Sequence, residues 1–142
     1  AFTIYGPNSR KSQFLPMIIR QIQNKNLSKI VLKKPQIMRD FLHVDDLVKA
    51  IFLCLKYKNK RNLNIFNVAS GKSLSIGFIV QKLIKISGKN KKLSILPVKK
   101  TISHVGDKSH YANIDKIKNQ LTWEPKININ RGLKKFYEQK QK

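Results

Sequence analysis

Hydrophobic residues along the chain follow two spacings, and each spacing predicts one kind of secondary structure. Short runs rich in β-branched and aromatic residues predict strands at residues 2–5, 29–32, 38–44, 63–68 and 93–96. Apolar residues repeated every three or four positions predict helices at residues 14–23, 45–55, 76–87, 114–121 and 131–137. Strands that alternate with helices favour the α/β class.

Two of the predicted helices have recognisable ends. Asp45 and Asp46 fall where the second helix begins, and a carboxylate there accepts a free backbone N–H and meets the positive end of the helix dipole. Ser75 is predicted to cap the third helix, and Gly88 to end it. These aspartates therefore need no ligand to explain them.

The composition indicates one folded domain covering residues 1–142. Hydrophobic residues make up 41% of the chain and charged residues 26%, which is a globular balance. No linker rich in Pro, Gly or Ser divides the sequence. The chain starts directly on AFTIYGP, an apolar strand without an initiator Met, which is the expected appearance of a fragment of a longer protein.

The charge is strongly basic, with 30 Lys and Arg against 7 Asp and Glu and a formal net charge of +23. Such a field would attract nucleic acid or another polyanion. However, 25 of the basic residues are Lys and only 5 are Arg, and they are spread along the whole chain together with many Ile and Asn. This pattern favours a general compositional bias over a designed nucleic-acid surface.

The single cysteine, Cys54, excludes an intramolecular disulfide and a metal site built on several cysteines. No run of about 18 apolar residues is present, and no N-terminal signal pattern is found. The simplest expectation is a cytoplasmic protein without a bound metal.

The segment RDFLHVDD, residues 39–46, holds three of the five aspartates of this basic chain. In a strand, Arg39 and His43 would point to one side and Asp40 to the other. A guanidinium such as that of Arg39 suits a phosphate, because it presents a planar fork of donors. The alternative is an ion pair between Arg39 and Asp40 or Asp45, and the segment alone leaves both readings open.

His43 lies in the same segment and is predicted to be a packed or turn-bonded residue. No carboxylate or nucleophile is spaced to make it part of a catalytic pair. We therefore predict no catalytic residue in this segment.

Five motifs in order along nearly the whole chain resemble the C-terminal part of the extended short-chain dehydrogenase/reductases, the NAD-dependent nucleotide-sugar epimerases and dehydratases. The motifs are FTIYGP, QFLPMIIRQI, QIMRDFLHVDDLVKAI, NIFNVASGKSLSI and GDKSHYANIDKIKNQLTWEPKININRGLKKF. The resemblance implies the last strands of a Rossmann-type sheet together with a small α/β substrate-binding subdomain.

Catalysis in this family uses a Gly-rich phosphate loop for NAD or NADP and a Tyr-x-x-x-Lys pair. Neither motif occurs in the 142 residues; the residues four positions after the tyrosines are Ser9, Arg61, Asp115 and Gln141. The expectation is that the N-terminal dinucleotide-binding part is absent from this chain and that the chain is not catalytic by itself. The full-length enzyme would use NAD or NADP and could be a homodimer.

The resemblance also implies roles for single residues. Phe2 would lie beside the nicotinamide, and Thr3 would face the sugar or its phosphate. Gln13 and Arg39 would hold the diphosphate, and Asp107 would bind the ribose of the nucleotide.

Two positions depart from the family pattern. Relatives often carry a second phosphate-binding Arg where this chain has His104, and a Gly-rich turn where this chain has Lys33-Lys34-Pro35. Either Lys33 or Lys34 could supply the missing charge, although an ammonium lacks the bidentate fork of Arg.

The leading hypothesis is thus the nucleotide-sugar-binding portion of an NAD(P)-dependent epimerase, dehydratase or reductase acting on UDP-, CDP- or dTDP-hexoses. The alternative is a basic, non-enzymatic module that binds RNA or another polyanion. A third hypothesis is a decayed remnant without a ligand, whose unpaired strand edges would make it aggregate.

Overall fold

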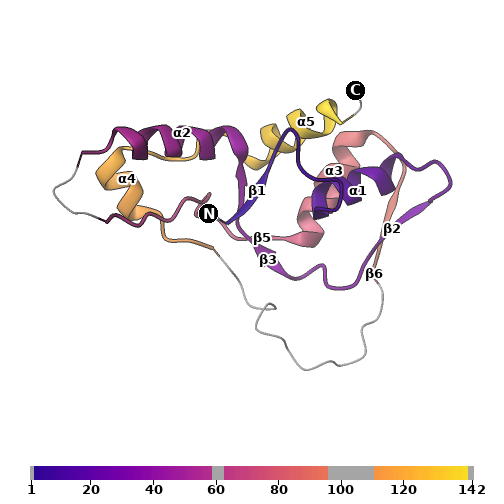
Figure 1. Ribbon diagram of the computed structural model, residues 1–142. Coiled ribbons are helices and arrows are strands. Elements are labelled where there is room, and N and C mark those ends of the chain that lie inside the picture. The colour runs from indigo at the N-terminus through magenta and orange to yellow at the C-terminus, as the bar shows by residue number, and fades with distance from the viewer. Residues whose placement is uncertain (1, 59–62, 96–110, 141–142) are drawn as a thin grey trace.

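The computed structural model describes residues 2–58, 63–95 and 111–140, and Figure 1 shows how their helices and strands are arranged. The strands are β1 (Thr3–Tyr5), β2 (Lys29–Leu32), β3 (Met38–Arg39), β4 (Phe41–His43), β5 (Leu74–Ser75) and β6 (Lys92–Ile95). The helices are α1 (Phe14–Gln23), α2 (Val44–Lys56), α3 (Ile76–Ser87), α4 (Asp115–Leu121) and α5 (Ile129–Gln139). None of these helices is long and apolar enough to cross a membrane. The predicted α/β class is confirmed.

The described strands form two-stranded ladders. β1 pairs with β4 in parallel, with Thr3 opposite Phe41, and β2 pairs with β6 in parallel. β3 pairs with β5 in the antiparallel direction, with Arg39 opposite Leu74. The predicted strand 38–44 is therefore two strands, which separate at Asp40 because each half pairs with a different partner.

The predicted strand at residues 63–68 is wrong. Leu63 and Ile65 are 75% and 70% exposed, and the segment makes no ladder with another described strand. The alternation of apolar residues in this segment predicted a strand. A strand also requires a hydrogen-bonded neighbour, which the periodicity of a sequence does not reveal.

Two apolar clusters hold the described parts together. In Figure 1, α1 and α3 lie on one side of β1, and α2 and α4 lie on the other. The larger cluster lies where α1, α3 and α5 pack against β1, β2 and β4. Its fully buried members include Ile19, Ile22, Val80, Leu83 and Phe136. The smaller cluster lies between α2, α4 and the residues after α4 and contains Leu42, Ala50, Ile117, Leu121 and Trp123. β1 and β4 lie between the two clusters and supply residues to both.

Asp40 is 1% exposed and connects three segments of the chain. One carboxylate oxygen accepts hydrogen bonds from the backbone N–H and the hydroxyl of Ser70, at 2.7 and 2.6 Å. The other oxygen accepts the backbone N–H of Gly71 at 2.9 Å and that of Ala112 at 3.4 Å. Because Gly71 has φ of 71°, a side chain at this position would be strained. The sequence predicted only that Asp40 points away from Arg39.

The start of α2 differs from the prediction that Asp45 and Asp46 cap it. The N-cap residue is His43, whose Nδ1 accepts the backbone N–H of Asp45 at 3.2 Å. Asp46 is fully buried and accepts the backbone N–H groups of Lys126 and Ile127 at 3.1 and 2.8 Å. Its role is therefore structural, as predicted, but it secures a distant loop.

Asp45 lies at the surface of the same turn. Its carboxylate accepts a hydrogen bond from the ammonium of Lys135 in α5 at 2.6 Å. This contact holds the pKa of Asp45 below its ordinary value, because the ammonium stabilises the charged carboxylate. Asp45 thus connects α2 with α5.

His43 is 1% exposed, and burial lowers the pKa of its imidazole below the ordinary value of 6.5. Asp45 and Asp46 oppose this shift, and Lys135 adds to it. Since Nδ1 accepts a hydrogen bond, the neutral ring carries its proton on Nε2, which has no hydrogen-bond partner among the described residues. His43 is packed and turn-bonded, as expected from its position in the motif.

Replacement of Asp40 tests the hydrogen bonds that its carboxylate accepts from Ser70, Gly71 and Ala112. The variant Asp40→Asn places amide N–H donors against backbone N–H donors, so the free energy of unfolding should fall by about 2–3 kcal/mol. Urea denaturation followed by circular dichroism measures this loss. The control Asp115→Asn, at an exposed position in α4, should cost less than about 1 kcal/mol. Equal losses in the two variants would contradict the role given to Asp40.

The buried imidazole of His43 should make stability depend on pH. Its pKa is lower in the folded than in the unfolded state, so the unfolded chain binds more protons, and the free energy of unfolding should decrease as pH falls below 6.5. Denaturation at several pH values measures the slope. In His43→Asn, which keeps an N-cap acceptor without an ionisable ring, the slope should be smaller. His104 and His110 are present in both proteins, so an unchanged slope would show that His43 is not its source.

Candidate functional site

Two adjoining cavities lie between β1, the start of α1 and the β3–β4 region. The first, which we call the β1 cavity, has a volume of about 300 Å³. The second, which we call the Arg39 cavity, has a volume of about 380 Å³. Both are lined by Thr3, Phe14 and Phe41, so these residues form a shared wall. Together the cavities are large enough for an elongated ligand of several chemical groups.

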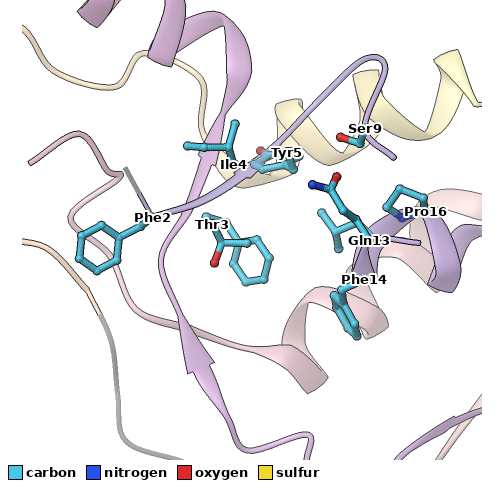
Figure 2. Close-up of a pocket in the computed structure, with 10 residues that line it drawn as sticks. Phe2, Thr3, Ile4, Tyr5, Ser9, Gln13, Phe14 and Pro16 are labelled. Carbon is cyan, nitrogen blue, oxygen red and sulfur yellow. The ribbon is translucent and has the colours of Figure 1, made fainter. Parts of the chain in front are cut away.

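The β1 cavity brings together three of the residues predicted from the sequence. Its lining contains Phe2, Thr3 and Gln13, and in Figure 2 Thr3 lies between the other two. Thr3 comes from β1 and Gln13 from the start of α1. Residues of the first two motifs therefore line one cavity, because β1 and α1 contribute to the same apolar cluster.

Gln13 is the N-cap residue of α1, but its side chain makes no capping hydrogen bond. Its backbone carbonyl accepts the N–H of Met17 at 3.1 Å, and its backbone N–H donates to the carbonyl of Arg10 at 2.9 Å. The backbone is thus fixed on both sides while the amide lines the cavity. An amide can both donate and accept, which suits a ligand with hydroxyl or phosphate oxygens.

Tyr5 also lines the β1 cavity, but only 3% of the residue is exposed. Burial, and then the negative charge of Asp46, raise the pKa of its phenol well above the ordinary value of 10.0. A phenol with a raised pKa stays neutral and is a poor base at neutral pH. The expectation that this chain is not catalytic by itself stays a prediction.

The Arg39 cavity contains the predicted phosphate-binding residue. Arg39 ends β3, is half-buried, and donates from Nη1 to the carbonyl of Met38 at 2.7 Å. The two aspartates considered as its ion-pair partners are engaged elsewhere, Asp40 with backbone N–H groups and Asp45 with Lys135. A ligand-binding role for Arg39 stays a prediction.

The remaining wall of the Arg39 cavity is mostly apolar and includes Leu32, Ile37 and Ile76. A flat, partly apolar group such as a base would bury its faces there, next to the cation. Lys34 lines the same cavity and Lys33 is not in its lining. Which of the two lysines binds phosphate is not decided by this lining alone.

One predicted site residue, Asp107, lies outside the described residues, as does His104. Sequence reasoning missed the walls of the two cavities, Phe14, Ile37, Phe41 and Ile76. Phe14 directly follows Gln13, and Phe41 lies two residues after Arg39, so their closeness to predicted site residues could have identified them. Ile76 gave no signal in the sequence, because it reaches the cavity through the pairing of β3 with β5.

In the three described ranges, no group of three or more His, Cys, Asp or Glu could hold a metal ion.

Residues 1–136 match the family model of GDP-mannose 4,6-dehydratase. The UDP-glucuronate 4-epimerase of Thermodesulfobacterium geofontis is 34% identical over 136 residues, which cover 94% of this chain and 39% of that protein. The CDP-paratose 2-epimerase of Salmonella typhi is 29% identical over 103 residues, which cover 71% of this chain and 29% of that protein. The chain therefore spans less than half the length of these relatives.

Solved structures agree with this relationship. The UDP-glucuronic acid 4-epimerase of Bacillus cereus, in complex with UDP-glucuronic acid and NAD, matches 99% of this chain and 43% of its own chain, with a TM-score of 0.79 and 27% identity. The fold is also that of RMD from Pseudomonas aeruginosa complexed with NADPH, with a TM-score of 0.83, 19% identity and coverage of 99% and 46%. The chain belongs to the GDP-mannose 4,6-dehydratase family and has the fold of the extended short-chain dehydrogenase/reductases.

Proposed function

We propose that this chain is the nucleotide-sugar-binding portion of an NAD(P)-dependent epimerase, dehydratase or reductase. The observation that carries the proposal is the shared wall of the two cavities. Phe2, Thr3, Gln13 and Arg39 come from three separate motifs and line two cavities that share Thr3. The family resemblance implies that these residues serve one ligand and its cofactor, and their position around adjoining cavities supports that role.

The cavities suggest how such a ligand would lie. Its diphosphate would meet the guanidinium of Arg39, whose planar fork of donors suits phosphate oxygens. Its base would lie against the apolar wall of the Arg39 cavity. The sugar would reach the β1 cavity, where the hydroxyl of Thr3 and the amide of Gln13 can bond to its hydroxyl groups. Asp107 would bind the ribose and remains a proposal from the family resemblance.

NAD or NADP, when bound to the full-length enzyme, supplies the group that accepts or donates hydride. Among the residues of this chain, Phe2 would lie beside its nicotinamide ring. Phe2 is 37% exposed at the mouth of the β1 cavity, next to the sugar position that Thr3 defines. The contribution of this chain is therefore to bind and orient the sugar, while the proton and hydride steps depend on the Gly-rich loop and the Tyr-x-x-x-Lys pair, which its 142 residues lack.

Calorimetric titration with UDP, CDP and dTDP tests the site. At least one of these diphosphates should bind the chain, and Arg39→Ala should weaken that binding tenfold or more, because a charge-assisted bidentate contact is lost. Arg131→Ala removes the same charge from an exposed position in α5, outside both cavities, and should change the affinity less than twofold.

The same proteins separate the proposal from a polyanion-binding module. Such a module would bind a random oligonucleotide with an affinity that falls steeply with salt, and Arg39→Ala would then weaken it no more than Arg131→Ala. This result, together with no binding of any nucleoside diphosphate to the unchanged chain, would overturn the proposed function.

The catalytic part should be encoded upstream in the same reading frame. We expect a strand followed by a Gly-rich loop, and a Tyr-x-x-x-Lys pair, in the residues before Ala1. Sequencing of the genomic region checks this directly. An upstream frame without either motif would contradict the enzyme reading, while the binding measurements above would stand separately.

A further inference from the structure

The Arg39 cavity contains a second cation, Lys34. We propose that Lys34 is the second phosphate-binding residue of this protein and forms, together with Arg39, a two-cation site for the diphosphate of the ligand. The inference rests on the proposed function and adds to it a residue that distinguishes this chain from relatives with a Gly-rich turn at the same place.

The turn that carries Lys34 is fixed to the start of α3. The Lys34 carbonyl accepts the backbone N–H of Ile37 at 3.3 Å, which closes the turn. Two further carbonyls of the turn bind α3: that of Pro35 accepts the N–H of Gly77 at 2.8 Å, and that of Ile37 accepts the N–H of Ile76 at 2.9 Å. The backbone of Lys34 is therefore held at a constant place relative to the cavity wall.

Gly77 allows this close approach. A Cβ atom at residue 77 would lie 3.0 Å from the Cβ of Pro35 and 3.2 Å from its carbonyl oxygen. These contacts are tighter than side chains normally make, so a larger residue would push the turn away from α3. Gly77 in α3 and Pro35 in the turn thus fit each other closely.

The same hydrogen bonds leave the start of α3 unable to bind an anion. The N–H groups of Ile76 and Gly77 donate to the turn, and that of Phe78 donates to the hydroxyl of Ser75 at 3.1 Å. A helix N-terminus binds phosphate through such N–H groups, and here they are already used. The negative charge of a diphosphate in the Arg39 cavity must therefore be balanced by side chains.

The two lysines of the turn differ in their surroundings. Lys33 is exposed and lies outside the cavity lining, whereas Lys34 is half-buried and lines the cavity with Arg39. A cation in a partly closed cavity interacts with a bound anion more strongly than a cation in water, because the effective dielectric constant is lower. Lys33 therefore provides a matched control with the same charge on the adjacent residue.

The test is calorimetric titration of the 142-residue chain and its variants with UDP, CDP and dTDP at low and high salt. Lys34→Gln should weaken the binding of the preferred diphosphate about tenfold, since one charge-assisted contact is lost. Lys34→Arg should keep the affinity within about threefold, and Lys33→Gln within about twofold. Higher salt should weaken binding less in Lys34→Gln than in the unchanged chain, because one screened charge is missing.

The outcomes separate the inference from the proposed function. If none of the three diphosphates binds the unchanged chain, the proposed function fails and this inference fails with it. A second outcome is that a diphosphate binds the unchanged chain with an affinity that Arg39→Ala reduces. If Lys34→Gln and Lys33→Gln then change this affinity equally, only the role of Lys34 is overturned. Loss of affinity in Lys34→Gln that Lys34→Arg restores would establish Lys34 as the second cation.

Discussion

The hydrogen bonds of the buried Asp40 carboxylate are the constraint on which the site most depends. Asp40 holds residues 70–71 and residue 112 against the junction of β3 and β4. The adjacent residue on one side is Arg39, which lines one cavity, and on the other side is Phe41, which lines both. Because successive residues of an extended chain point in opposite directions, fixing Asp40 inward also fixes Arg39 and Phe41 toward the cavities.

The clustering of aspartates in so basic a chain has a structural explanation. Asp40 and Asp46 are buried, and each accepts backbone N–H groups from segments far along the sequence. Asp45 pairs with Lys135 and so joins α2 to α5. Lysine could replace none of them, since it has no acceptor atom. A lysine at position 40 or 46 would therefore lose hydrogen bonds that connect buried parts of the fold.

The two cavities depend on contacts that cross the chain. β1 is brought beside β4, and β3 beside β5, so that the beginning of the chain, the RDF segment and the start of α3 surround one space. Several apolar side chains nevertheless stay outside the described clusters, among them Phe52 and Leu55 of α2, which are 59% and 77% exposed. The proposal of a longer protein agrees with this exposure, since the matched relatives are more than twice as long as the matched region.

The sequence by itself determined the α/β class, most helices to within a few residues, and four residues that line the two cavities. It did so because helical periodicity is local and because the motifs keep their order along the chain. Tertiary structure decided the rest. Residues 63–68 form no ladder with another described strand, and Asp46 binds a loop about eighty residues away. Tertiary structure likewise decided that Lys34, and not the adjacent Lys33, lines the Arg39 cavity, because the turn that carries both lysines is hydrogen-bonded to the start of α3.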